Sequence, residues 1–153
     1  KGDFPTAETA ELLNDELYFQ RAVQVYLWSL PAVNMWAMKE GSEKTYGAGY
    51  NVLPVWKERL NARTKVTTPN SDCLYAMAYV NIAKDGPIVV EVPANNQGIL
   101  DDFYQRPLTG PTIDGKTFTG DFGFAGPDGG KGGKYLIVPW DYKGPEPEGH
   151  YVY

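Results

Sequence analysis

The feature that most constrains the fold is a change in sequence pattern near Gly47. Before this point, apolar residues recur at the three- and four-residue spacing of an α-helix. After it, glycine and proline become frequent, and the apolar runs shorten to the lengths typical of β-strands. No alternation of strands with long helices appears, so a parallel sheet is not expected. The pattern predicts an α+β protein, with a helical arm at residues 1–46 and a β-rich part at residues 47–153.

The helical arm is predicted to begin at Thr6, a residue type that caps helix N-termini. Apolar residues follow at helical spacing over residues 12–30, and most charged residues occupy the opposite side. Pro31 is expected to end this amphipathic helix, because proline lacks the backbone N–H that helix continuation needs. A second, short helix is predicted at residues 32–40, ending at Gly41.

The β-rich part is predicted from short apolar runs separated by turn-forming residues. Strands are expected at residues 73–82, 88–92, 98–106, 117–124, 135–138 and from 151 onward. The turn sequence at residues 84–87 between the first two predicts an antiparallel hairpin. The regular spacing indicates that the N-terminal amphipathic helix packs on an antiparallel β-sandwich or jelly roll.

Length, charge and hydropathy exclude several classes of protein. The 153 residues correspond to one domain, and the net charge is -5, with lysines and arginines scattered singly and not gathered into a basic stripe. Nucleic acid is therefore not an expected partner. The longest apolar stretch, residues 25–38, is interrupted by polar residues and is shorter than the roughly 20 residues that cross a bilayer. No membrane span is expected.

The usual signatures of metal and cofactor sites are missing from the sequence. One cysteine, Cys73, and one histidine, His150, cannot build a zinc site or an internal disulfide. The glycine-rich residues 126–134 lack the spacing of a phosphate-binding loop, so a flexible hairpin loop is expected there. We expect Cys73 to be a small buried residue in its strand and His150 to be structural. No cofactor or metal is predicted; a calcium loop is a weaker idea, based on Asp101, Asp114, Asp121 and Asp128 without EF-hand spacing.

A first candidate site follows the polar turn at residues 67–72. Its structural interpretation is a corner whose side chains bond to nearby backbone groups. Its functional interpretation is a pocket, because a strand after the turn would place Tyr75 and Tyr79 on one face, with Asn70 and Asp72 at its rim. In that interpretation Asp72 is catalytic, and Asn70, Tyr75 and Tyr79 bind the ligand.

A second candidate site lies in the predicted strand at residues 98–106. Strand alternation would place Asp102, Tyr104 and Arg106 on one face, which is too polar for a purely structural strand. One interpretation is an edge strand in which Asp and Arg pair with neighbours. The other is a ligand-facing wall in which Arg106 binds an anion, and Asp102 and Tyr104 are catalytic. Burial beside aromatic rings would raise the pKa of a carboxylate acting as a base.

Four segments carry a resemblance to a known family, namely residues 26–35, 50–54, 61–72 and 98–107. They resemble the bacterial domain-of-unknown-function family twelve-fifty-four. The resemblance implies that the C-terminal domain of the same polypeptide, of family twelve-fourteen, follows this segment. It also implies a periplasmic or secreted protein whose signal peptide has been removed. The aromatic strand predicted at residues 150–153 agrees with a polypeptide that continues.

Two functions of different classes are compatible with the sequence. The first is an extracytoplasmic enzyme or binding protein for a small polar or anionic ligand, which would use the two candidate sites. The second is a noncatalytic assembly module of a homo-oligomer, in which the 11 tyrosines and 4 tryptophans pack between domains and subunits. Neither the residues nor the resemblance identifies a reaction or a substrate.

Overall fold

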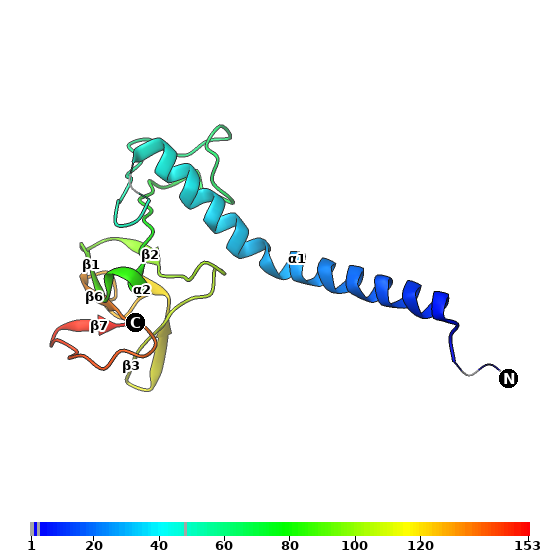
Figure 1. The fold of residues 1–153 in the computed structure, drawn as a ribbon. Coiled ribbons are helices and arrows are strands. Elements are labelled where there is room, and N and C mark those ends of the chain that lie inside the picture. The colour runs from blue at the N-terminus through cyan, green and yellow to red at the C-terminus, as the bar shows by residue number, and fades with distance from the viewer. Residues whose placement is uncertain (1, 3, 48) are drawn as a thin grey trace.

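The computed structural model describes residues 2, 4–47 and 49–153 (Figure 1). The elements are α1 (Ala7–Tyr46), α2 (Ile82–Asp85), β1 (Ile88–Val92), β2 (Gln97–Ile99), β3 (Thr109–Ile113), β4 (Lys116–Thr119), β5 (Asp121–Gly123), β6 (Gly133–Ile137) and β7 (His150–Val152). One long helix leads a set of mainly antiparallel strands, so the predicted α+β class is confirmed. Figure 1 shows the first half of α1 projecting away from the rest of the chain, while its second half lies beside the loops that follow it.

Helix α1 is one continuous helix of 40 residues. The predicted start is confirmed, because the Thr6 hydroxyl accepts a hydrogen bond of 3.2 Å from the Thr9 backbone N–H. The predicted end at Pro31 is wrong, and Gly41 also lies inside the helix. Pro31 removes one backbone hydrogen bond, yet the turns on both sides remain helical, and the axis bends near the middle in Figure 1. The helix ends at Gly47, whose φ of 102° suits a residue without a side chain.

The strands form three small sheets. In the largest, of order β1-β6-β7, β6 is antiparallel to β1 and parallel to β7. The other two sheets are the antiparallel pairs β2-β5 and β3-β4. The strand predicted at residues 88–92 is confirmed with the same bounds. The one predicted at residues 117–124 is divided into β4 and β5 by Gly120, which has a φ of 69°.

The hairpin predicted between residues 73–82 and β1 is wrong. Residues 73–82 run instead beside residues 51–56, where they form one isolated bridge, between Val55 and Ala76. Backbone hydrogen bonds link the two segments sparsely, as from Met77 N–H to the Pro54 carbonyl at 3.2 Å. A proline within the partner segment cannot donate a hydrogen bond, so a regular ladder does not develop there. Strand β1 pairs with β6, more than forty residues further along the chain.

The core of the β-rich part is built from tyrosine and valine. Tyr135 on β6 is fully buried, and Val92 and Tyr153 are buried beside it. The Tyr135 ring lies 5.1 Å from that of Tyr151 and 5.8 Å from that of Phe122 on β5. Tilted ring pairs at these distances are favourable, and each adds about 0.5–1.5 kcal/mol to the effect of burial. The core therefore joins the three-stranded sheet to β5.

Candidate functional site

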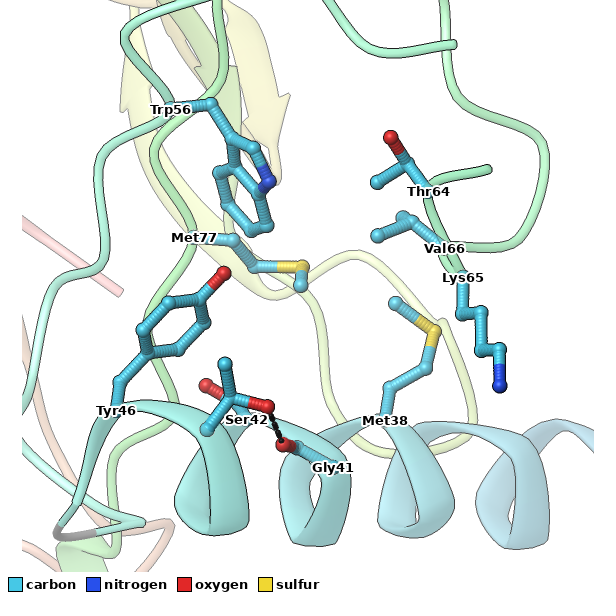
Figure 2. Close-up of a pocket in the computed structure, with 10 residues that line it drawn as sticks. Met38, Gly41, Ser42, Tyr46, Trp56, Thr64, Lys65, Val66 and Met77 are labelled. Carbon is cyan, nitrogen blue, oxygen red and sulfur yellow. Dashed lines mark hydrogen bonds between the residues drawn. The ribbon is translucent and has the colours of Figure 1, made fainter. Parts of the chain in front are cut away.

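A cavity of about 170 Å³ lies between the second half of α1 and the loops that follow it (Figure 2). Its lining residues are Met38, Gly41, Ser42, Thr45 and Tyr46 from α1, and Trp56, Thr64, Lys65, Val66 and Met77 from the loops. An engineered cavity of about 150 Å³ holds a benzene molecule, so this space suits a group the size of one aromatic ring. It is smaller than the roughly 300–1,000 Å³ of pockets for drug-sized ligands.

The lining of this cavity is largely apolar and includes methionine and aromatic side chains. The rings of Tyr46 and Trp56 meet edge to face at 6.3 Å, and the side chains of Met38 and Met77 point into the space beside them (Figure 2). Methionine adapts its shape and makes favourable contacts with aromatic groups. Among the ten lining residues, Lys65 alone carries a charge. The cavity can hold a small apolar group, with a cation available for an anionic substituent at its edge.

A second and more open cavity, of about 350 Å³, adjoins the first. Its lining residues are Leu60, Asn61, Ala62, Thr64, Val66, Pro69 and Ser71. Thr64 and Val66 line both cavities and therefore form a shared wall. Because Pro69 and Ser71 belong to the turn at residues 67–72, the first predicted site borders this second cavity.

The four residues predicted for the first site are divided between two environments. The Asn70 backbone N–H donates to the Tyr75 hydroxyl at 3.0 Å, and the Asn70 side-chain oxygen accepts from the Asp72 backbone N–H at 2.5 Å. This turn is closed by its own hydrogen bonds, as the structural interpretation describes, and neither Asn70 nor Asp72 lines a described cavity. Tyr79 is buried, with its ring 5.8 Å from that of Phe103, and burial raises its pKa.

The three residues predicted for the second site come together through a turn and not through strand alternation. The regular strand β2 ends at Ile99, and the Asp102 carboxylate accepts hydrogen bonds from the Tyr104 and Arg106 backbone N–H groups at 2.7 and 3.1 Å. It also forms an ion pair with the Arg106 guanidinium at 2.6 Å. The Arg106 guanidinium in turn lies 5.4 Å from the centre of the Tyr104 ring.

The electrostatics of this turn differ from those of a general base. Partial burial acts to raise the pKa of Asp102, but the hydrogen bonds from Arg106 and the backbone outweigh it and lower that pKa. Asp102 is therefore ionised and already paired at neutral pH. The carboxylate with a raised pKa is its neighbour Asp101, because of burial and then the negative charges of Asp102 and Asp121.

The same turn supports α1. The ring of Tyr104 lies 4.9 Å from that of Trp28, and the ring of Phe103 lies 6.2 Å from that of Trp36. Both tryptophans are on α1, so the turn forms a contact between the helix and the β-rich part. What the structure shows for this turn is therefore a packing contact with α1.

Sequence reasoning missed a buried lysine on α1. The Lys39 ammonium contacts the Glu43 carboxylate at 2.6 Å and the Glu40 carboxylate at 3.1 Å, and it lies over the rings of Trp36 and Tyr50. The hydrogen bonds to Glu43 and Glu40 raise the pKa of Lys39. The four-residue spacing from Lys39 to Glu43 gave no signal, because the predicted helix ended at Gly41, before Glu43.

Asp128 was considered only for a calcium loop, and its hydrogen bonds within and beside the loop at residues 126–134, where a flexible hairpin loop was expected, were missed. Its buried carboxylate accepts hydrogen bonds from the Gly123 and Gly132 backbone N–H groups at 2.7 and 2.8 Å, and a third from the Tyr135 hydroxyl. Burial acts to raise the pKa of Asp128, but these three hydrogen bonds outweigh it and lower that pKa. Aspartate before glycine commonly forms such side-chain-to-backbone turns.

Two further findings concern reactive groups. Cys73 is exposed, which corrects the expectation that it is buried, because the segment that carries it is not a regular strand. Within residues 2, 4–47 and 49–153, no group of three or more His, Cys, Asp or Glu side chains is placed to hold a metal ion. Neither helix of this described part is both long and apolar enough to cross a membrane.

A comparison with models of protein families gives a match. A family model described as "Protein of unknown function (DUF1254)" matches residues 50–153. The match includes both cavity-lining loops and the whole β-rich part, and it begins after the end of α1. No curated protein matches the chain.

Proposed function

The chain belongs to the DUF1254 family of proteins of unknown function, and from this premise we propose that it is an assembly module whose α1 arm is covered by a partner. One observation carries the proposal. Between Leu12 and Leu30, eleven large hydrophobic side chains of α1 are exposed, with exposed fractions such as 64% for Leu12, 62% for Phe19 and 64% for Tyr26.

The size of this surface supports the proposal. The 24 residues from Ala7 to Leu30 form about 36 Å of helix, at about 1.5 Å per residue. If each exposed side chain offers roughly 100 Å², about half the area that a large aromatic side chain buries, the eleven together offer about 1,000 Å². Folded monomers seldom leave more than a few hundred Å² of continuous apolar surface in water. A partner would remove this surface from solvent.

The distribution of the apolar residues indicates how the arm is covered. Leu12, Phe19 and Tyr26 share one side of α1, whereas Tyr18 and Val25 lie on another. A helix that is apolar on several sides is typical of a buried position. We propose that the cover comes from the C-terminal domain of the same polypeptide and from further copies of the protein in a homo-oligomer, in the periplasm or outside the cell.

Hydrogen exchange of the purified full-length protein tests the proposal. We expect the backbone amides of residues 11–30 to be strongly protected, and the variant F19D/L30D to lose this protection. The matched variant N14D/Q24D adds the same two charges at polar positions of α1 and should keep the protection. Exchange of residues 11–30 at the rate of a free peptide in the unaltered protein would refute the assembly proposal.

A second candidate function is the binding of a small ligand in the cavity of Figure 2, where Lys65 offers a charge beside Trp56 and the two methionines. Calorimetry with benzoate and with benzyl alcohol, its neutral counterpart, tests this candidate. We expect benzoate to bind more tightly, and K65M to weaken benzoate up to about fivefold while leaving benzyl alcohol unaffected, since an exposed charge contributes about 0.2–1 kcal/mol. Absence of binding by both compounds at millimolar concentration would remove the candidate. The catalytic roles of Asp72, Asp102 and Tyr104 stay predictions.

A further inference from the structure

We propose that the partner of α1 is a second copy of this chain, packed antiparallel, so that the acidic start of one α1 lies beside the basic loop of the other. This inference rests on the proposed function and names the partner. The basic loop is defined as residues 57–65. The acidic start is defined as residues 8–16.

Charge complementarity is the first argument. The acidic start carries Glu8, Glu11, Asp15 and Glu16, and no basic residue precedes Arg21 in α1. The basic loop carries Lys57, Arg59, Arg63 and Lys65, which are exposed, against the single acid Glu58. In the described part of the chain, ion pairs are confined to Lys39 and Arg106 with their acidic neighbours. Both charged segments are therefore available to a partner.

The position of the two segments is the second argument. Lys65 lines the same cavity as Met38 and Ser42, so the basic loop lies against the second half of α1. The acidic start lies at the other end of the helix, which projects away from all loops in Figure 1. A helix of 40 residues is about 60 Å long. The opposite charges are thus held apart within one chain, but they meet twice in an antiparallel pair.

The spacing of the apolar residues is the third argument. Leu12, Phe19, Tyr26 and Val33 recur every seven residues, and Val23 and Leu30 each follow one of them by four. This is the spacing of a helix-to-helix contact, and all six side chains are exposed. The position four residues after Leu12 is Glu16, and the antiparallel arrangement places this acid towards the basic loop of the partner. A parallel pair would place one acidic start against the other, which is unfavourable.

The area of the apolar contact covers most of what such a pair needs. A stable interface of standard size buries about 800 Å² on each partner, and the six apolar side chains of the contact offer about 600 Å² at roughly 100 Å² each. The acidic start and the basic loop, which face each other in the antiparallel pair, supply the remainder. The other apolar sides of α1 remain for other parts of an assembly.

Charge reversal in the intact chain tests the arrangement, with the dimer dissociation constant measured by native mass spectrometry and sedimentation. The acid-reversed variant is E8K/E11K/D15K, and the base-reversed variant is R59E/R63E/K65E. Each alone should raise the dissociation constant at least about tenfold, because each reversal acts twice in a symmetric dimer. A mixture of the acid-reversed and base-reversed variants should pair again, and so should a chain that carries both sets of substitutions. The control K84E/K131E/K143E reverses three exposed lysines outside the basic loop and should leave pairing unchanged.

Cross-linking between copies provides an independent test of direction. In a C73S background, a mixture of E11C and R63C chains treated with a short bismaleimide should give the mixed dimer. Predominant E11C-to-E11C products would overturn the antiparallel arrangement, as would a dimer that is insensitive to both charge reversals. A monomer at 100 µM with protected α1 amides would overturn the second copy as partner and leave the assembly proposal standing. A monomer with unprotected α1 amides would overturn both.

Discussion

The substitution of Asp128 by alanine is expected to destabilise the β-rich part strongly. The change removes the acceptor of three hydrogen bonds, from the Gly123 and Gly132 backbone N–H groups and from the Tyr135 hydroxyl. Gly123 and Tyr135 are buried, so their donors would be left without a partner, whereas half-buried Gly132 can turn to water. An unsatisfied buried donor costs about 1–3 kcal/mol. The expected loss is about 3–5 kcal/mol of unfolding free energy.

Thermal and urea unfolding, followed by tyrosine fluorescence and far-UV circular dichroism, measure this loss. A loss of about 3–5 kcal/mol corresponds to a fall in melting temperature of about 10–15 °C for a chain of this size. Asp128→Asn should lose less, because the amide keeps one oxygen acceptor. Asp141→Ala is the control, since Asp141 is an exposed carboxylate in another turn. A loss below about 1 kcal/mol for Asp128→Ala, equal to that of the control, would refute the reasoning.

The pH dependence gives a second readout of the same residue. The folded-state pKa of Asp128 is lowered, so its stabilising contribution is fully present above the unfolded value of about 4. It is lost as the pH falls through the folded-state pKa. The difference in stability between the unaltered protein and Asp128→Asn should therefore be constant from pH 5 to 8 and shrink below pH 4. A difference that grows towards acid pH would contradict the sign of this linkage.

Three further pairs of substitutions test other contacts. Gly98→Ala should lower the free energy of urea unfolding by about 2–3 kcal/mol, because an added Cβ would overlap the Phe122 ring. Gly41→Ala, at an open position in α1, should instead raise it by about 0.5–1 kcal/mol. Equal effects of the two substitutions would contradict the packing around Gly98. Tyr79→Ala should cost about 3–5 kcal/mol and Tyr79→Phe less than about 1 kcal/mol, since burial of the ring dominates. Asp102→Ala should lower the free energy of unfolding by about 1–2 kcal/mol. Asp102→Asn should lower it by about half as much, because the amide oxygen still accepts hydrogen bonds from the backbone N–H groups. Equal losses would show that the ion pair with Arg106 dominates.

The α+β class could be predicted because several local sequence patterns agree with the structure. The cap at Thr6, the helical spacing after it and the apolar run of β1 each agree with the observed element. The end of α1 did not follow from the sequence, because Pro31 removes one hydrogen bond while the flanking turns keep theirs. Strand pairing could not be predicted either. The turn at residues 84–87 predicted a local hairpin, whereas β1 pairs with distant β6, and the sequence alone does not reveal such long-range partners.

For the candidate sites, too, the sequence indicated the residue types but not their geometry. Asp102, Tyr104 and Arg106 were expected on one face of a strand, whereas the structure joins them through a turn. Alternation would have left the Asp102 carboxylate facing a ligand, whereas the turn satisfies it with two backbone N–H groups and Arg106. The cavity of Figure 2 was not predicted, because Met38 on α1 and Trp56 and Met77 in the loops come together only through tertiary structure.

The two halves of the chain differ in whether they contain a buried apolar core. In the β-rich part, Tyr135 is fully buried with Val92 and Tyr153 beside it, although other apolar side chains there, such as Phe124 and Trp140, are exposed. In the first half of α1, Leu12, Phe19 and Tyr26 contribute apolar area that no described segment covers. Most helical stability in proteins comes from the packing of an apolar face against other elements and not from helix propensity. We therefore expect the stability of the arm to depend on the partner that covers it, and this expectation is the physical basis for assigning assembly to α1.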